Sequence, residues 1–169
     1  MTGLLKLADA IDTFVIAAGK FAAALILVIV ALVTWNVVSR YFGGGTPVAL
    51  QELEWHLLAV VALLGISTLM QQNGHVRVDM LYERLSRRAR HMVDLFSMIV
   101  GIVVSIMIIR YSLGFLDSSI SLGEGSPDPG GLPMRYALKA LIPAGFAVFG
   151  LQCAALAIRH AAALSGREA

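Results

Sequence analysis

The sequence predicts an all-α membrane protein with four transmembrane helices and a short amphipathic helix between the second and the third. Apolar residues make up 58% and charged residues 14% of the 169-residue chain, and the mean hydropathy is +0.80. Soluble domains have about 45–50% apolar and about 25% charged residues. Four apolar blocks approach the roughly 20 residues that a helix needs to cross about 30 Å of hydrocarbon. The blocks are 21–38, 57–70, 92–109 and 140–158.

These blocks define a single integral membrane domain over residues 1–169. We expect spans at about 17–39, 52–71, 92–113 and 138–159. The first block continues into Trp35, Asn36 and Arg40 without a small-residue cleavage pattern, which predicts a retained anchor rather than a secretory signal.

Close helix contacts are predicted where small residues recur four apart. The pairs are Gly101 with Ser105, Ala140 with Ala144, and Gly150 with Ala154. The lone Cys153 cannot form an intrachain disulfide and is interpreted as a small packing residue.

Lys and Arg residues predict the orientation, because cytoplasmic loops carry an excess of them. Segment 71–91 holds five arginines and should be cytoplasmic, which puts both termini on the same side. Nine of the 13 basic residues then lie inside, namely Lys6, Lys20, Arg77, Arg84, Arg87, Arg88, Arg90, Arg159 and Arg167. Arg40, Arg110, Arg135 and Lys139 lie outside.

The cytoplasmic segment 76–91 has apolar side chains at three- and four-residue steps, while most of its arginines fall elsewhere. This pattern predicts a short helix in the membrane interface that faces anionic lipid headgroups. A solvated charged turn that only sets the topology is the alternative.

The outer connection before the fourth block contains Ser126–Pro133, with three prolines and two adjacent glycines. Prolines remove backbone donors and glycines permit left-handed turns, so a shaped turn is expected instead of a helix or a strand. The turn either only reverses the chain or also offers Asp128 as a docking edge for another protein.

Charged residues gather near the ends of the blocks, so a proton or ion relay through this chain alone is not expected. Arg40 closes the first block and Glu52 and Glu54 open the second, which makes a charge pair at the outer interface geometrically easy. Asn36 shares the face of Arg40. Interfacial anchoring by Trp35, Trp55 and Arg40 is the alternative interpretation. Lys139 can reach the outer interface, and Pro143 near the start of the fourth helix should cost little.

Catalytic and cofactor motifs are not found in the sequence: it has no phosphate-binding glycine loop, nucleophile elbow or paired-histidine metal motif. We therefore expect no enzyme activity, no catalytic, substrate or metal ligand, and no cofactor. Because the net charge is only +2 and the basic residues form no single face, nucleic acid is not an expected partner.

Three motifs resemble the small membrane (DctQ-type) subunit of the tripartite ATP-independent periplasmic (TRAP) transporters. They are Asn36–Tyr41 (NVVSRY), Leu50–Trp55 (LQELEW) and Gly74–Asp79 (GHVRVD). The segments Asp128–Pro133 and Lys139–Pro143 resemble a branch associated with mannitol, chloroaromatic compounds or 2-oxo acids. One departure is that Leu53 separates the two glutamates, which are adjacent in many members.

The resemblance implies a sodium-coupled secondary transporter in the bacterial inner membrane. A periplasmic solute-binding protein would deliver an organic acid to a large membrane subunit, and this chain, surrounded by membrane lipids, would brace that subunit. It also implies structural or subunit-interface roles for Asn36, Arg40, Glu52, Glu54, Trp55, His75, Arg77, Asp79, Asp128, Arg135, Lys139 and Pro143. In this scheme Asp79 would help to cap the cytoplasmic helix. The transported substrate is not predicted, and the alternative function is an anchor subunit of a respiratory or signalling complex.

Overall fold

The computed structural model describes residues 2–72, 74, 82 and 85–166, and these contain four long helices and no β-strand. Helix α1 comprises Thr2–Tyr41, α2 Val48–Gln71, α4 Arg87–Ser121 and α5 Arg135–Leu164. All four helices are long and apolar enough to cross a membrane. The predicted fold class, an all-α protein with four membrane-spanning helices, is therefore confirmed.

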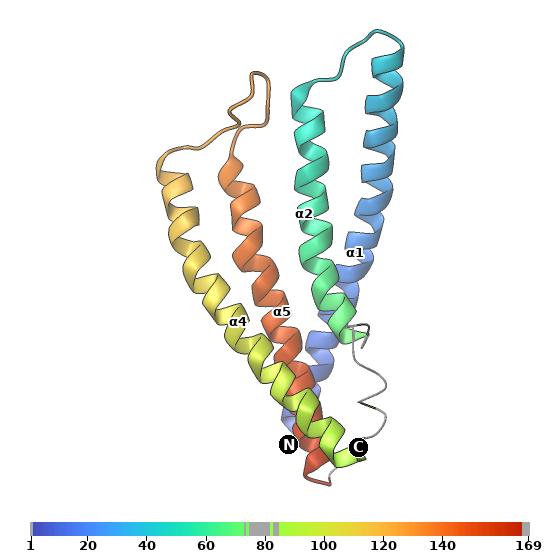
Figure 1. Cartoon of the computed structure of the whole chain (residues 1–169), viewed down its shortest axis with the longest axis vertical. Helices are drawn as coiled ribbons and strands as arrows, with labels where there is room; N and C mark the ends of the chain where they lie inside the picture. The colour runs from blue at the N-terminus through green and yellow to red at the C-terminus, as the bar shows by residue number, and fades with distance from the viewer. Residues whose placement is uncertain (1, 73, 75–81, 83–84, 167–169) are drawn as a thin grey trace.

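The helices form two antiparallel hairpins, α1 with α2 and α4 with α5 (Figure 1). Connections 42–47 and 122–134 lie at one end of the bundle, called the loop end below, and both chain termini lie at the other, the terminal end. The hairpins meet near the terminal end and diverge toward the loop end (Figure 1). Helix α5 contacts each of the other three helices, so it is the central element of the bundle.

Small residues let α5 approach α4 closely. A Cβ on Gly101 would lie 2.8 Å from Cys153 Sγ, and a Cβ on Gly150 would lie 3.1 Å from Ser105 Cβ. Cys153 is fully buried beside Met98. The predicted contacts through Gly101, Ser105 and Gly150 and the packing role of Cys153 are confirmed.

Two other close approaches were not predicted from the spacing of small residues. Gly145 of α5 faces Leu63 of α2, where an added Cβ would lie 2.6 Å from Leu63 Cβ, and Gly19 of α1 faces Thr68. Ala144 is exposed, so Gly145 provides the contact that we expected from its neighbour. Which of two adjacent small residues makes the contact depends on which face of the helix packs against its neighbour.

The helices extend beyond the predicted spans. With about 1.5 Å of rise per residue, the 40 residues of α1 cover roughly 60 Å, about twice the hydrocarbon thickness. Residues 87–91, assigned above to the interfacial segment, form the start of α4, and Ser86 caps this helix by accepting a hydrogen bond from the Ala89 N–H at 3.3 Å. Most of the remaining predicted interfacial segment lies outside the described residues.

The expectation for Pro143 was wrong. Helix α5 begins at Arg135, so Pro143 lies about two turns inside the helix rather than in its first turn. Its missing N–H removes the intrahelical hydrogen bond to the carbonyl of Lys139. Sequence patterns locate helix ends poorly, because the last polar turns outside an apolar block carry little signal.

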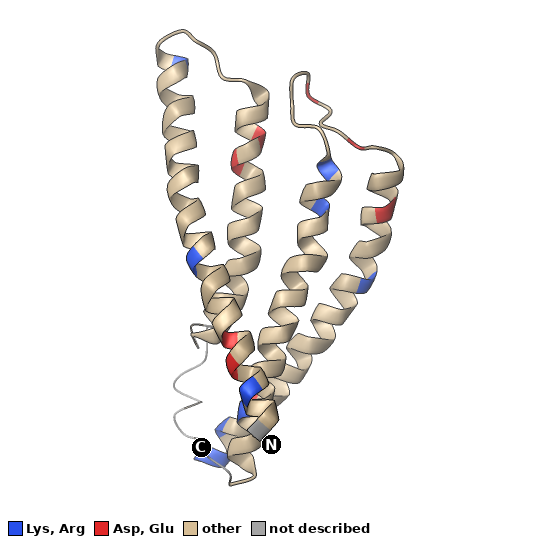
Figure 2. Ribbon diagram, turned by 180° about the vertical axis from the view of Figure 1, so that it is seen from behind, with Lys and Arg blue, Asp and Glu red and all other residues tan. Residues whose placement is uncertain are grey.

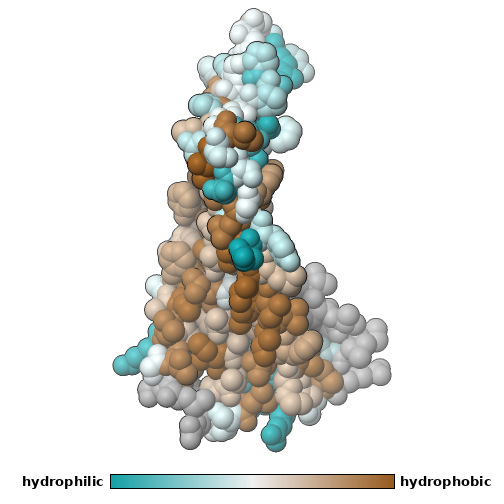
Figure 3. Space-filling view, turned by 90° about the vertical axis from the view of Figure 1, so that its left-hand side faces the viewer, coloured by the Kyte–Doolittle hydropathy of each residue, from teal (hydrophilic) through white to brown (hydrophobic). Residues whose placement is uncertain are grey.

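Polar and apolar residues are separated along the bundle. Most Lys, Arg, Asp and Glu residues lie toward the two ends of the bundle, although Lys20 lies halfway along α1 (Figure 2). Apolar side chains cover the broad lower part of the face in Figure 3, whereas its narrow upper part is largely polar. Large apolar residues on the outside include Leu27, Phe96 and Ile106, which are 73%, 68% and 61% exposed. Such a surface requires lipid or other membrane helices around it.

Candidate functional site

Glu52 holds the long connection 122–134 against α2. Its Oε1 accepts a hydrogen bond from the Ser126 hydroxyl, and its Oε2 accepts one from the Leu132 backbone N–H at 2.6 Å. The Ser126 N–H donates to the Leu132 carbonyl at 3.1 Å, which closes the loop around the carboxylate. A Cβ on Gly131 would lie 2.8 Å from Glu52 Oε2. The expected shaped turn is thus present, and a side chain of α2 determines its shape.

The exposed Asp128 lies at the tip of this turn. Its N–H donates to the Ser126 hydroxyl oxygen at 3.1 Å, and its carbonyl accepts the Gly131 N–H at 3.0 Å. The carboxylate of Asp128 itself makes no hydrogen bond or ion pair with the described residues. A partner therefore has access to it.

A second carboxylate, Glu124, joins the start of the same loop to α5. It accepts hydrogen bonds from the Lys139 ammonium and from the Ser119 hydroxyl, the latter at 2.6 Å. The Arg135 N–H donates to the Glu124 carbonyl at 2.8 Å. Lys139 Nζ also lies 3.9 Å from the Phe115 ring centroid, within cation–π range. The hydrogen bonds from Lys139 and, second, from Ser119 lower the pKa of Glu124 from its ordinary 4.5, because they stabilise the carboxylate.

Between α1 and α2, a cavity with both polar and apolar walls opens near the loop end. It has a volume of about 520 Å³ and is lined by Val33, Asn36, Val37, Arg40, Tyr41, Gln51, Glu54 and Trp55; we call it the Asn36 cavity. Asn36 is buried, and its Nδ2 donates to Glu54 Oε1, while its Oδ1 is buried without a partner. The cavity therefore gathers four of the predicted site residues on two neighbouring helices.

Arg40 does not form the ion pair with Glu52 or Glu54 that the sequence suggested. Among the described residues, no ion pair or side-chain hydrogen bond to Arg40 is formed. Glu52 instead lies on the side of α2 that faces the loop before α5. One helical turn cannot direct both Glu52 and Glu54 toward Arg40, because residues two apart point to different faces.

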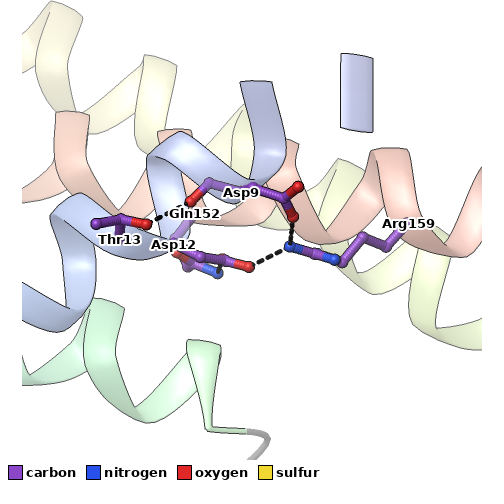
Figure 4. Close-up of polar contacts among 5 residues, drawn as sticks. All are labelled: Asp9, Asp12, Thr13, Gln152 and Arg159. Carbon is purple, nitrogen blue, oxygen red and sulfur yellow. Dashed lines mark hydrogen bonds and ion pairs between the residues drawn. The ribbon is translucent and has the colours of Figure 1, made fainter. Parts of the chain in front are cut away.

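At the terminal end, α1 and α5 are joined by the Asp12 cluster, made of Asp9, Asp12, Gln152 and Arg159 (Figure 4). The Arg159 guanidinium bridges Asp9 Oδ1 at 2.7 Å and Asp12 Oδ2 at 2.5 Å. Gln152 Nε2 donates to Asp12 Oδ1 at 2.9 Å, and Gln152 is fully buried. Asp12 therefore connects the two helices through a charged and a neutral donor at once.

The sequence analysis missed this cluster, although two signals for it exist. Asp9 and Asp12 are three apart on α1, and Gln152 and Arg159 are seven apart on α5, so each pair shares a helix face. Gln152 is also a polar residue inside an apolar block. Neither signal identifies the partner, because 140 positions separate Asp12 from Gln152.

A neighbouring group of titratable side chains links α4 to α5 at the same end. Asp94 is buried, accepts a hydrogen bond from the Tyr82 hydroxyl at 2.5 Å, and lies 3.9 Å from His160 Nδ1. His91 and His160 bring their Nδ1 atoms within 3.2 Å. Within the described part of the chain, no three His, Cys, Asp or Glu side chains are arranged to hold a metal ion.

His75, Arg77 and Asp79 lie outside the described residues, so their predicted capping role stays a prediction. The remaining predicted residues all lie at the loop end. Trp55 is 72% exposed beside the Asn36 cavity, and Arg135 and Lys139 lie in the first two turns of α5. At this end Glu52 and Glu124 accept hydrogen bonds that hold the loop 122–134, and Glu54 lines the Asn36 cavity, so these carboxylates can position neighbouring elements.

Comparison with protein families gives a match over most of the chain. The model of the family described as tripartite ATP-independent periplasmic transporters, DctQ component, matches residues 29–163. No curated protein matches the chain significantly. The matched range covers most of the chain, including the Asn36 cavity, Glu52 and its loop, and α5 up to Ala163.

Proposed function

The chain belongs to the DctQ component family of the tripartite ATP-independent periplasmic transporters, and we propose that it is the static scaffold of such a transporter. It is a small permease subunit with four apolar helices in the inner membrane. The family implies association with a large membrane subunit and a binding protein. Membership of a transporter family favours transport over the alternative of an anchor for a respiratory or signalling complex.

The observation that carries the scaffold proposal is that polar side chains connect the helices of this chain to one another. Arg159 and Gln152 of α5 hold Asp12 of α1, and Glu52 of α2 holds the loop before α5. The outer helix faces remain apolar. A subunit with cross-linked helices and an apolar exterior is suited to bracing a moving neighbour.

We further propose that the complete transporter takes up an organic acid with a sodium gradient and that the binding protein delivers this substrate. The support is the family, in which the large subunit provides the transport site. The positive-inside rule supports cytoplasmic termini for this chain. The loop end then faces the periplasm, where the exposed Asp128 is available to the binding protein.

Uptake by reconstituted vesicles tests the scaffold role. Vesicles that contain this chain alone should take up no organic acid under a sodium gradient, whereas vesicles with the large subunit, this chain and the binding protein should do so. Replacing the sodium gradient by a potassium gradient should abolish uptake. Uptake by this chain alone would contradict the scaffold role, and unchanged uptake under potassium would contradict sodium coupling only.

A further inference from the structure

The Asn36 cavity contains one cation and one anion that do not contact each other. Arg40 forms no ion pair with any described residue, and Glu54 is held through Oε1 by Asn36 Nδ2. Both side chains nonetheless line the same cavity of about 520 Å³, which is within the roughly 300–1,000 Å³ of small-molecule sites. The walls therefore offer separate positions for a negative and a positive group.

On the Glu54 side of this cavity, two hydrogen-bond acceptors have no donor. Glu54 Oε2 receives no hydrogen bond from the described residues, and Asn36 Oδ1 is buried without a partner. A buried acceptor without a donor is costly. An occupant with an N–H-bearing cation would therefore be favoured at this side, whereas Arg40 favours an anion that accepts several hydrogen bonds, such as a phosphate.

Other residues that line the cavity are of the types found at a membrane–water interface. Tyr41 and Trp55 are 87% and 72% exposed, and aromatic residues of this kind gather at the level of lipid headgroups. Val33 and Val37 line the cavity on the side toward the membrane interior, and the exposed apolar surface of α1 continues from them through Val30. A bound molecule can thus have its charged part in the cavity and its apolar part along α1.

We propose that the Asn36 cavity binds the headgroup of phosphatidylethanolamine. The primary ammonium donates to Glu54, the phosphate binds Arg40, and the acyl chains lie along Val33 and Val37. Phosphatidylglycerol lacks the cation, and the quaternary ammonium of phosphatidylcholine has no N–H to donate. The cavity therefore distinguishes among lipids of equal chain length by hydrogen bonding.

Native mass spectrometry of the full-length chain in complex with its large subunit tests the proposal. The complex is equilibrated with equal amounts of phosphatidylethanolamine, phosphatidylcholine and phosphatidylglycerol of identical chains, and the lipids retained by this subunit are identified. We expect a roughly tenfold preference for phosphatidylethanolamine over phosphatidylcholine, as one charge-assisted hydrogen bond predicts. Glu54→Gln should abolish the preference, and Arg40→Gln should lower retention of all three lipids.

Matched controls are Asp117→Asn and Arg110→Gln, which change exposed charges of α4 away from the cavity. Both should retain the wild-type preference. Equal retention of the three lipids by wild type, or an unchanged preference in Glu54→Gln, would overturn the proposal. A photo-cross-linking amino acid in place of Trp55 should label lipid, and exclusive labelling of the large subunit would show that a protein fills the cavity instead.

Discussion

Glu52 on α2 accepts the backbone N–H of Leu132 at 2.6 Å, although 80 positions separate the two residues. The same carboxylate accepts the Ser126 hydroxyl, so both sides of the proline- and glycine-containing turn are attached to one side chain. The loop end of the second hairpin is thereby joined to the first hairpin, in the region where the two diverge (Figure 1).

Glu52→Ala should release this turn. We expect faster amide hydrogen exchange at Leu132 and earlier proteolytic cleavage within 122–134, because the N–H loses its acceptor. Asp117→Ala, which removes an exposed carboxylate of α4, is the control and should leave both measurements unchanged. Wild-type protection of Leu132 in Glu52→Ala would show that the loop keeps its shape without the carboxylate.

Asp12→Ala should destabilise the bundle by about 1–3 kcal/mol, because the fully buried Gln152 amide loses its acceptor. Asp9→Ala should cost less than about 1 kcal/mol, since the Asp9 side chain is 63% exposed and its ion pair is screened. Thermal unfolding in one detergent measures both. A double-mutant cycle with Gln152→Leu isolates the contact, and additive effects would contradict direct coupling.

Gly101→Ala should destabilise the contact of α4 with α5 by roughly 1–3 kcal/mol through overpacking, because its Cβ would lie 2.8 Å from Cys153 Sγ. Adding Cys153→Ala should restore part of the loss by removing the sulfur. Gly114→Ala on the same helix meets no atom within 4 Å and should be neutral or slightly stabilising. Melting temperatures compare the variants; a neutral Gly101→Ala would mean that the helices separate easily.

The pKa of Glu124 should lie below its ordinary 4.5, because Lys139 and Ser119 donate to the carboxylate. A carboxyl whose pKa is lower in the folded state stabilises the fold above its unfolded pKa. That stabilisation is lost as the pH falls through the lowered value. NMR titration of labelled glutamate carboxyls can follow this, and Lys139→Met should raise the pKa whereas the distant Lys20→Met should not. An equal response to both would contradict the assigned cause.

Compartment-sensitive reporters fused after residues 45, 88, 123 and 166 should report two sides of the membrane. We expect external activity at 45 and 123 and cytoplasmic activity at 88 and 166, because nine of the 13 basic residues then lie inside. External activity at position 88 would reverse the proposed orientation.

Hydropathy and residue spacing were sufficient to predict the fold class, the number of membrane helices and the small-residue contacts of α4 with α5. Hydropathy is a sum over neighbouring residues, and the spacing of Gly101 and Ser105 reports one helix face, so both are local properties. The same local information misplaced Pro143, because polar turns beyond an apolar block belong to α5 without contributing to its hydropathy signal.

Which polar groups meet depends on how the four helices pack against one another. Glu52 could have paired with Arg40 across a short connection, but its direction on α2 brings it to Leu132. Asp12 finds Gln152 and Arg159 because α5 packs against α1, and nothing within either helix encodes that neighbour. The partner of a side chain depends on helix packing and rotation, which combine contacts far apart in the chain and so cannot be obtained from any local pattern.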